Sequence, residues 1–167
     1  MTVILDDGET RLDLPSDAAT AARVVRIKGS ADLWNYAHPL SALTEIGGNA
    51  ELDGYKHPLP ALARIGGMAF LGGYAHALSS LTYISGEALL RGYAHMPAWI
   101  GYVGDDSRGY SFWADLLRRR VRGGCRNFNP EEALAHWGPG GESDRPDCLA
   151  LAQQAIALIE RNKEERT

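Results

Sequence analysis

The sequence has few cysteines, no long apolar run and no large excess of charge of one sign. Its two cysteines, Cys125 and Cys148, are too few for the disulfide framework of a small secreted domain, so we expect two reduced thiols. No run of about 20 apolar residues could cross a bilayer, and the opening MTVILDDGET lacks the basic and apolar parts of a signal peptide. These absences predict a cytoplasmic protein without membrane contact.

Charge and composition exclude other classes. The formal net charge of -4 neither favours a nucleic-acid partner for the whole chain nor suggests an acidic mimic of nucleic acid. The 45% of hydrophobic and 23% of charged residues are ordinary for a folded protein, which excludes wholesale disorder. A chain of 167 residues is long enough for one compact domain, or for a repeat array with a small domain attached.

One nineteen-residue phrase occurs four times without insertion between Lys28 and Val103. Its fourth position is always Ala and its sixth is always Leu, which is the alternation of a strand with one buried face. Leu or Ile at position sixteen and Ile or Val at position nineteen predict a second inward edge. Such a fixed period is typical of a solenoid, in which each unit buries its apolar face against its neighbours. The copies are KGSADLWNYAHPLSALTEI, GGNAELDGYKHPLPALARI, GGMAFLGGYAHALSSLTYI and SGEALLRGYAHMPAWIGYV.

Corner residues separate the two inward edges of each copy. Asn or Gly precedes the tyrosine, where a positive φ would allow a sharp bend, and Gly at position two marks the other corner. Nineteen residues with two or three bends favour a mostly extended coil. The corner residues are Asn35, Gly54, Gly73 and Gly92 on one side and Gly29, Gly48, Gly67 and Gly86 on the other.

The first 27 residues read as strands and a degenerate capping coil. An Asp7-Gly8 turn predicts a hairpin, and residues 16–23 favour a short helical turn. Residues 9–27 match the repeat weakly, as a terminal unit should. Its expected inward residues are Leu12, Leu14, Val24 and Ile27.

After Val103 the period ends and a third region, residues 104–167, begins. A loop leads to two extended segments, 110–117 and 121–128, although a helix over 112–122 is an alternative. Asn129-Pro130-Glu131-Glu132 predicts a capped helix, and another should begin near Pro146. The predicted fold is α+β: a short right-handed parallel β-solenoid of about five coils with a C-terminal ββαα cap.

The pattern L-x-x-L-x-x-I-G-G-x-A-x-L-x-G-Y, seen in residues 59–74, resembles a compact leucine-rich repeat. It is also similar to repeats of uncharacterised phage and prophage proteins, and residues 124–137 resemble a C-terminal block of such proteins. The resemblance covers about half the chain and implies a binding scaffold with no catalytic residue. It further implies action in a host cytoplasm, where the protein would inhibit a defence complex such as a CRISPR effector.

Two polar ladders run through the repeats. His38, His57, His76 and His95 recur two residues after tyrosines 36, 55, 74 and 93. A column spaces histidines along a line with no carboxylate or thiol in register, so we expect no metal ion. The favoured role is structural: each Tyr packs at a corner and each His bonds a turn backbone group. A pH-sensitive role is an alternative.

Function is expected where the copies differ. The outward strand positions change from acidic to apolar to basic along the stack, which predicts a partner-binding face, unless the C-terminal region or a second copy covers it. Its residues are Asp32, Trp34, Glu51, Asp53, Met68, Phe70, Leu89 and Arg91.

The C-terminal region offers two weaker candidates. Cys125 and His136 could pair as nucleophile and base, but no orienting acid is evident. An arginine cluster could contact phosphates as a nucleic-acid site. The sequence therefore favours a non-enzymatic protein-binding module without cofactor or metal, with a homodimer and nucleic-acid binding as alternatives. The cluster consists of Arg118, Arg119, Arg120, Arg122 and Arg126.

Overall fold

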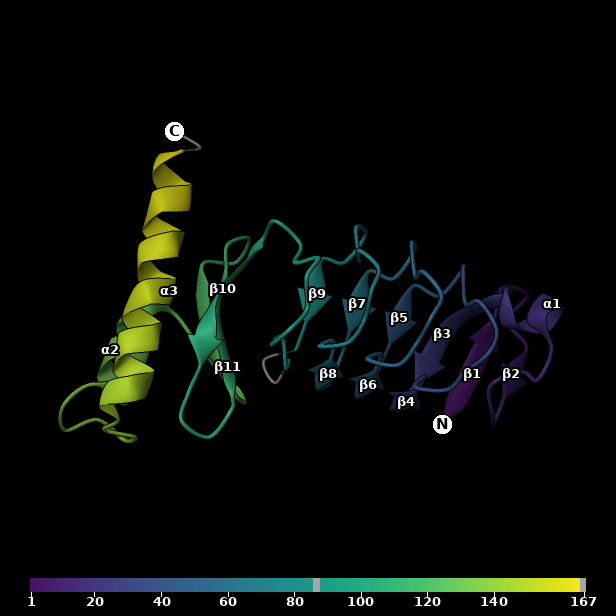
Figure 1. The fold of residues 1–167 in the computed structure, drawn as a ribbon, viewed down its shortest axis with the longest axis horizontal. Coiled ribbons are helices and arrows are strands. Elements are labelled where there is room, and N and C mark those ends of the chain that lie inside the picture. The colour runs from purple at the N-terminus through teal and green to yellow at the C-terminus, as the bar shows by residue number, and fades with distance from the viewer. Residues whose placement is uncertain (86–87, 166–167) are drawn as a thin grey trace. The chain divides into compact units, whose positions relative to one another are not determined.

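The computed structural model describes residues 1–85 and 88–165 and divides the chain into two compact units, Met1–Pro97 and Ala98–Thr167 (Figure 1). Unit 1 contains β1 (Thr2–Leu5), β2 (Thr10–Arg11), α1 (Ala18–Ala21), β3 (Val24–Lys28), β4 (Ala31–Asp32), β5 (Glu45–Ile46), β6 (Ala50–Glu51), β7 (Arg64–Ile65), β8 (Ala69–Phe70) and β9 (Tyr83–Ile84). Unit 2 contains β10 (Ile100–Asp105), β11 (Ser111–Asp115), β12 (Arg120–Gly123), β13 (Arg126–Phe128), α2 (Pro130–Trp137) and α3 (Pro146–Glu164).

The predicted fold class is wrong. The structure is a mixed α/β protein with a six-stranded mixed sheet (β2-β1-β3-β5-β7-β9), a three-stranded parallel sheet (β4-β6-β8) and a four-stranded antiparallel sheet (β10-β11-β12-β13). Strand β1 pairs antiparallel with both β2 and β3, so the first sheet is not a purely parallel stack. The expected ββαα cap is instead a unit with four strands, and its first strand, Ile100–Asp105, begins inside the fourth copy.

Neighbouring copies nevertheless pair at the nineteen-residue interval. Ala31 lies opposite Ala50, and Ala50 opposite Ala69, while Ile46 lies opposite Ile65 in the other sheet. Each of the first three copies thus gives one two-residue strand to each sheet, and the shared Ala, Leu and Ile residues face inward. The buried residues include Ala31, Ala50, Ala69, Ala88, Leu33, Leu52, Leu71, Leu90, Leu43, Leu62, Leu81, Ile46, Ile65 and Ile84.

The corner glycines are needed mainly for close approach. The positive φ expected before the tyrosine holds for Gly92 (80°), and Gly29 at the other corner also has a positive φ (88°). At Gly48, by contrast, an added Cβ would lie 2.6 Å from the carbonyl carbon of Gly29 in the preceding copy. Stacked turns therefore leave no room for a side chain. The positive-φ prediction is wrong for Asn35, Gly54 and Gly73, and Gly86 at the other corner lies outside the described residues.

The N-terminal predictions are partly confirmed. The hairpin of β1 and β2 turns at Gly8, and the short helix α1 is capped by Asp17, whose carboxylate accepts a bond from Thr20 N. Ile27 is buried and pairs with Ile46 as expected. Leu12 is 75% exposed, so its inward placement is wrong.

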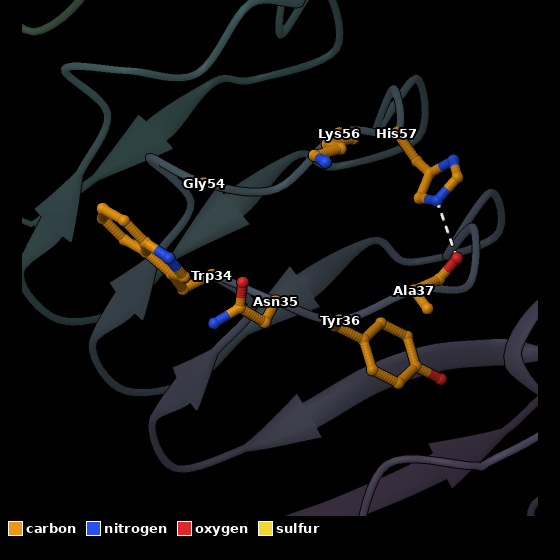
Figure 2. A pocket seen from close by; sticks show the side chains of 7 residues that line it. All are labelled: Trp34, Asn35, Tyr36, Ala37, Gly54, Lys56 and His57. Carbon is orange, nitrogen blue, oxygen red and sulfur yellow. Dashed lines mark hydrogen bonds between the residues drawn. The ribbon is translucent and has the colours of Figure 1, made fainter.

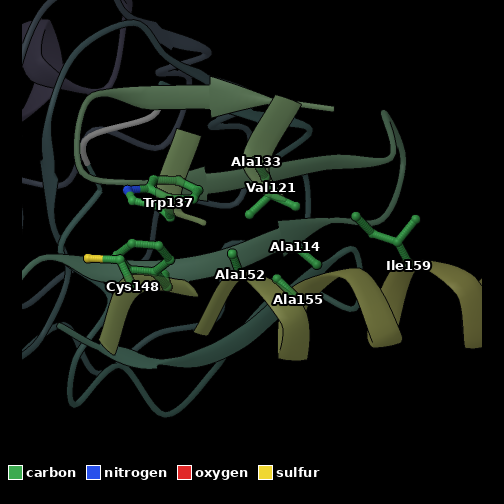
Figure 3. Close-up of a cluster of buried hydrophobic side chains, with 9 residues drawn as sticks. Ala114, Val121, Ala133, Trp137, Cys148, Ala152, Ala155 and Ile159 are labelled. Carbon is green, nitrogen blue, oxygen red and sulfur yellow. The ribbon is translucent and has the colours of Figure 1, made fainter. Parts of the chain in front are cut away.

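Unit 2 has its own core (Figure 3). The helix over 112–122 is wrong, and the extended alternative is correct in part: segment 110–117 contains β11, but segment 121–128 is divided by a turn at residues 124–125 into β12 and β13. The capping box of α2 is confirmed: Asn129 and Glu132 exchange two side chain–backbone bonds of 2.8 Å. No helix in the described ranges is long and apolar enough to span a membrane. The core comprises Phe112, Ala114, Val121, Ala133, Trp137, Cys148, Ala152, Ala155 and Ile159.

Candidate functional site

The outward side chains of β4, β6 and β8, with the residues that follow them, share one side of a sheet. Burial alternates along β4, where Ala31 and Leu33 are buried while Asp32 and Trp34 are exposed. Glu51 continues this outward row in β6, and Phe70 continues it in β8, which bridges to Leu89. We call this surface the variable face. It comprises Asp32, Trp34, Glu51, Asp53, Met68, Phe70, Leu89 and Arg91, as the sequence predicted for the partner-binding residues.

One end of the variable face is acidic. Asp32 lies directly opposite Glu51 in the parallel register, and Asp53 follows two residues later on the same side. Asp32 Oδ1 accepts a 3.0 Å hydrogen bond from Trp34 N, which fixes the turn after β4. Within residues 1–85 and 88–165, neither Glu51 nor Asp53 has an ion pair; Glu51 is exposed and Asp53 is half-buried.

Trp34 is held as an aromatic shelf at this end. Its side chain is 46% exposed, and the absence of a side chain at Gly54 lets the ring lie against the next copy. An added Cβ at Gly54 would come within 2.7 Å of Trp34 O and 2.9 Å of ring atom Cδ2. A hollow of about 280 Å³ adjoins the ring, and Figure 2 shows the residues that line it. Its lining residues are Trp34, Asn35, Tyr36, Ala37, Gly54, Lys56 and His57.

The other end is apolar apart from Arg91, which is exposed two residues after Leu89. Met68, Phe70 and Leu89 are half-buried rather than covered, and Phe70 and Leu89 are neighbours across the sheet. Their exposed surface adjoins the acidic end, because Glu51 pairs with Phe70. An aromatic shelf, three carboxylates and an apolar strip are thus continuous on one sheet.

The tyrosine ladder is built into the core. The Tyr55 hydroxyl donates to His38 O at 2.9 Å and accepts from Leu40 N at 2.9 Å, and Tyr93 repeats the pattern with His76 O and Leu78 N. Ring centroids of successive tyrosines lie 6.4–6.5 Å apart. Burial raises the pKa of Tyr55 to about 12. The hydroxyls therefore act as neutral bridges between copies.

The histidine ladder is also structural where its bonds are described. Nε2 of His38 bonds Ser16 O at 2.8 Å, and His57 and His76 bond Ala37 O and Lys56 O at 2.9 Å. A carbonyl only accepts, so each Nε2 must carry the hydrogen. His95 contacts the ring of Tyr93 at 6.2 Å between centroids.

The arginine cluster is divided among internal ion pairs. Arg122 is buried 3.6 Å from an Asp115 oxygen, and its guanidinium lies 5.4 Å from the centre of the Trp113 ring. An anion would have to compete with a carboxylate at every position. The pairs are Arg118 with Asp115 (3.2 Å), Arg119 with Glu160 (3.3 Å), Arg120 with Glu132 (3.5 Å), Arg122 with Asp115 (3.6 Å) and Arg126 with Glu142 (3.6 Å).

No hydrogen bond joins Cys125 to His136 in the described part of unit 2. Cys125 is exposed, whereas His136 is buried with Nδ1 3.2 Å from Glu142 Oε2. The two side chains are therefore not arranged as a thiol nucleophile beside its base.

Sequence reasoning missed one cluster, around Asp106. Asp106 is buried, and its Oδ1 accepts bonds from the backbone N of Arg108 (2.9 Å) and Tyr110 (3.0 Å), while Oδ2 accepts from the Arg108 side chain. Burial opposes its ionisation, yet these bonds hold its pKa below the usual value. The segment Asp105-Asp106-Ser107-Arg108-Gly109 reads only as a loop, because its partners lie on α3.

Two α3 residues complete that cluster. Asp147 accepts bonds from Ser107 N and Arg145, and the Ser107 bonds lower the pKa of Asp147 to about 2. Burial raises the pKa of Cys148 to about 11, so this thiol is unreactive at neutral pH. Asp106, Asp147 and Cys148 bring three possible ligand atoms within 4.8 Å, but both carboxylates already serve the loop and the arginines. We assign the cluster to holding residues 106–110 on α3.

No family model, curated protein or solved structure matches this chain, and its function must be argued from its own geometry.

Proposed function

We propose that the protein is a non-enzymatic binding module that docks on another protein through the variable face. The single observation behind this is the contrast between the two sides of the β4-β6-β8 sheet. Inward side chains are almost identical from copy to copy, while outward ones differ and leave Trp34 46% exposed at one end of the face and an apolar strip at the other, with carboxylates between them. Exposed aromatic and apolar side chains bordered by charge are typical of protein interfaces, and Trp is enriched among their energetic centres.

The test is affinity capture from bacterial lysate with the full chain, compared with a Trp34→Ala, Phe70→Ala variant. We expect a partner that the wild-type chain captures and the variant loses. The matched control is Leu12→Ala, which truncates another exposed apolar side chain in unit 1 and should capture normally. Equal capture by all three proteins, or capture of nothing, would contradict the proposal.

The resemblance to phage repeat proteins suggests a narrower role, inhibition of a host defence complex by occupying one of its surfaces. A captured partner that belongs to such a complex, and whose activity the wild-type chain but not the double variant inhibits, is the result this version requires.

A further inference from the structure

The charges on the two sheets of unit 1 are arranged differently. On the mixed sheet, Arg26 Nε lies 2.9 Å from Glu45 Oε2, and Arg64 Nε lies 3.7 Å from Glu45 Oε1. The Arg64 guanidinium also lies 4.0 Å from the centre of the Tyr83 ring. These outward residues, one per copy, alternate in sign and neutralise one another.

The variable face does the opposite. Asp32 and Glu51 are like charges directly opposite in a parallel pair, which destabilises a sheet. Asp53 adds a third carboxylate on the same side. Lys56 lines the neighbouring hollow but forms no ion pair with the three acids among the described residues. A cation supplied from outside would relieve this repulsion.

The spacing of the acids disfavours a metal ion. In the described ranges, only Asp106, Asp147 and Cys148 place three possible ligand atoms within 4.8 Å of one another. The oxygens of Asp32, Glu51 and Asp53 are therefore too far apart to surround one ion, which needs ligands at roughly 2–2.6 Å. A planar cation on a flexible side chain can contact separated carboxylates in turn.

The Trp34 ring indicates which kind of cation fits the acidic end of the variable face. Its indole is fixed by the Asp32 turn and by Gly54, and it stays half-exposed beside the acids. A guanidinium stacks on an indole face and pairs with carboxylates through its planar set of donors, and it gives up water more readily than an ammonium.

We propose that the acidic end of the variable face binds an arginine side chain of the partner protein. The guanidinium lies on Trp34 and pairs with Glu51 and its neighbouring acids, while Met68, Phe70 and Leu89 receive apolar side chains of the same segment. This inference depends on the proposed function, since it specifies the chemistry of the partner's segment at the same face.

The test uses acetyl-arginine amide and its neutral isostere acetyl-citrulline amide as probes of the full chain at low salt. Nuclear magnetic resonance can follow the Trp34 indole N–H, and the indole signals of the buried Trp99, Trp113 and Trp137, which a surface ligand cannot reach, serve as internal references. We expect arginine to shift this signal with an affinity roughly five- to tenfold above that of citrulline. Glu51→Gln and Asp53→Asn should each reduce the preference, and the control Asp13→Asn, an exposed acid outside the face, should not.

A second readout separates binding from damage to the fold. Because Asp32 and Glu51 repel each other, Glu51→Gln should raise the melting temperature slightly while it weakens arginine binding. Equal response to both probes, an equal loss in Asp13→Asn, the same shift with calcium ions, or a loss on Lys56→Gln but not on Glu51→Gln would each overturn the inference. The proposed function is tested separately. It is contradicted if the Trp34→Ala, Phe70→Ala variant captures the same partners as the wild type, regardless of how the two probes bind.

Discussion

Removing one hydroxyl from the tyrosine ladder should destabilise unit 1 strongly. The Tyr55 ring is 2% exposed, and its hydroxyl connects His38 O to Leu40 N, each at 2.9 Å. In Tyr55→Phe the ring remains, but two hydrogen bonds worth about 1 kcal/mol each are lost. The buried Leu40 N–H is also left without its acceptor, which adds about 1 kcal/mol, for a total of about 3 kcal/mol.

Thermal unfolding followed by circular dichroism measures this cost. For a domain of under 100 residues, 1 kcal/mol corresponds to about 4–8 °C, so the melting temperature of unit 1 should fall by roughly 10–25 °C. The melting temperature of Tyr36→Phe, which loses one 2.7 Å hydrogen bond to Pro15 O, should fall by less. Tyr110→Phe, 45% exposed, should change little. A Tyr55→Phe protein as stable as Tyr110→Phe would refute the bridging role of the hydroxyls.

Three other perturbations follow from the structure. The pKa of Tyr55 is raised to about 12, so its neutral hydroxyl contributes stability that is complete below about pH 10 and is lost as pH rises through 12. Over this range the melting temperature should fall while tyrosinate absorbance appears. A melting temperature that does not change with pH would contradict this prediction. Gly54→Ala should cost about 1–3 kcal/mol in unfolding free energy and change Trp34 fluorescence, because its Cβ would meet Trp34 O at 2.7 Å, whereas Gly47→Ala, with its nearest atom at 3.4 Å, should be tolerated. Asp106→Asn should lower the unfolding free energy of unit 2 by about 2–3 kcal/mol, since it weakens charged bonds to Arg108 and Arg145, and scanning calorimetry should show no change in unit 1 if the cluster serves unit 2 alone.

The repeat could be predicted from sequence because its inward positions do one job in every copy. Ala50 and Leu52 are buried in the way that Ala31 and Leu33 are, and alternation reveals this without knowledge of neighbours. The Tyr and His roles were also accessible in outline. The acceptors of those bonds were not, because they lie 17 to 22 residues away and depend on the path of the preceding copy.

The fold-class prediction was wrong because the same apolar-polar alternation fits both parallel and antiparallel strand pairing. An apolar-polar alternation states which side of a strand is buried, but not the direction of its neighbour. Ile100 to Val103 continue the repeat in sequence, yet they pair antiparallel with β11, and Val3 does the same with Ile27 at the other end. The nineteen-residue period therefore located the copies that pair in parallel, but it gave the wrong pairing direction at both ends of the stack.

The arginine cluster shows a related limit of sequence reasoning. Five arginines within nine residues suggest one basic patch, but in the structure each lies near a carboxylate of unit 2 that the local sequence does not reveal as its partner. Arg122 is buried against Asp115 and Trp113, while Arg120 on the same strand bonds Asn127 O at 2.7 Å. Local charge density in a sequence predicts a surface patch only when the chain is known to place those side chains together.

The glycine column connects the repeated and the variable residues of unit 1. Gly54 is present because a Cβ would strike the carbonyl of the preceding copy, which is a requirement of stacking. The same missing side chain gives the indole of Trp34 a flat support, which a binding surface can use. At the equivalent place one copy later, Asp53 lies over Gly73, with its carboxyl carbon 3.5 Å from where a Cβ would stand. Stacking therefore requires glycine at this position, and the residue that packs on the glycine can differ from copy to copy without cost to the core.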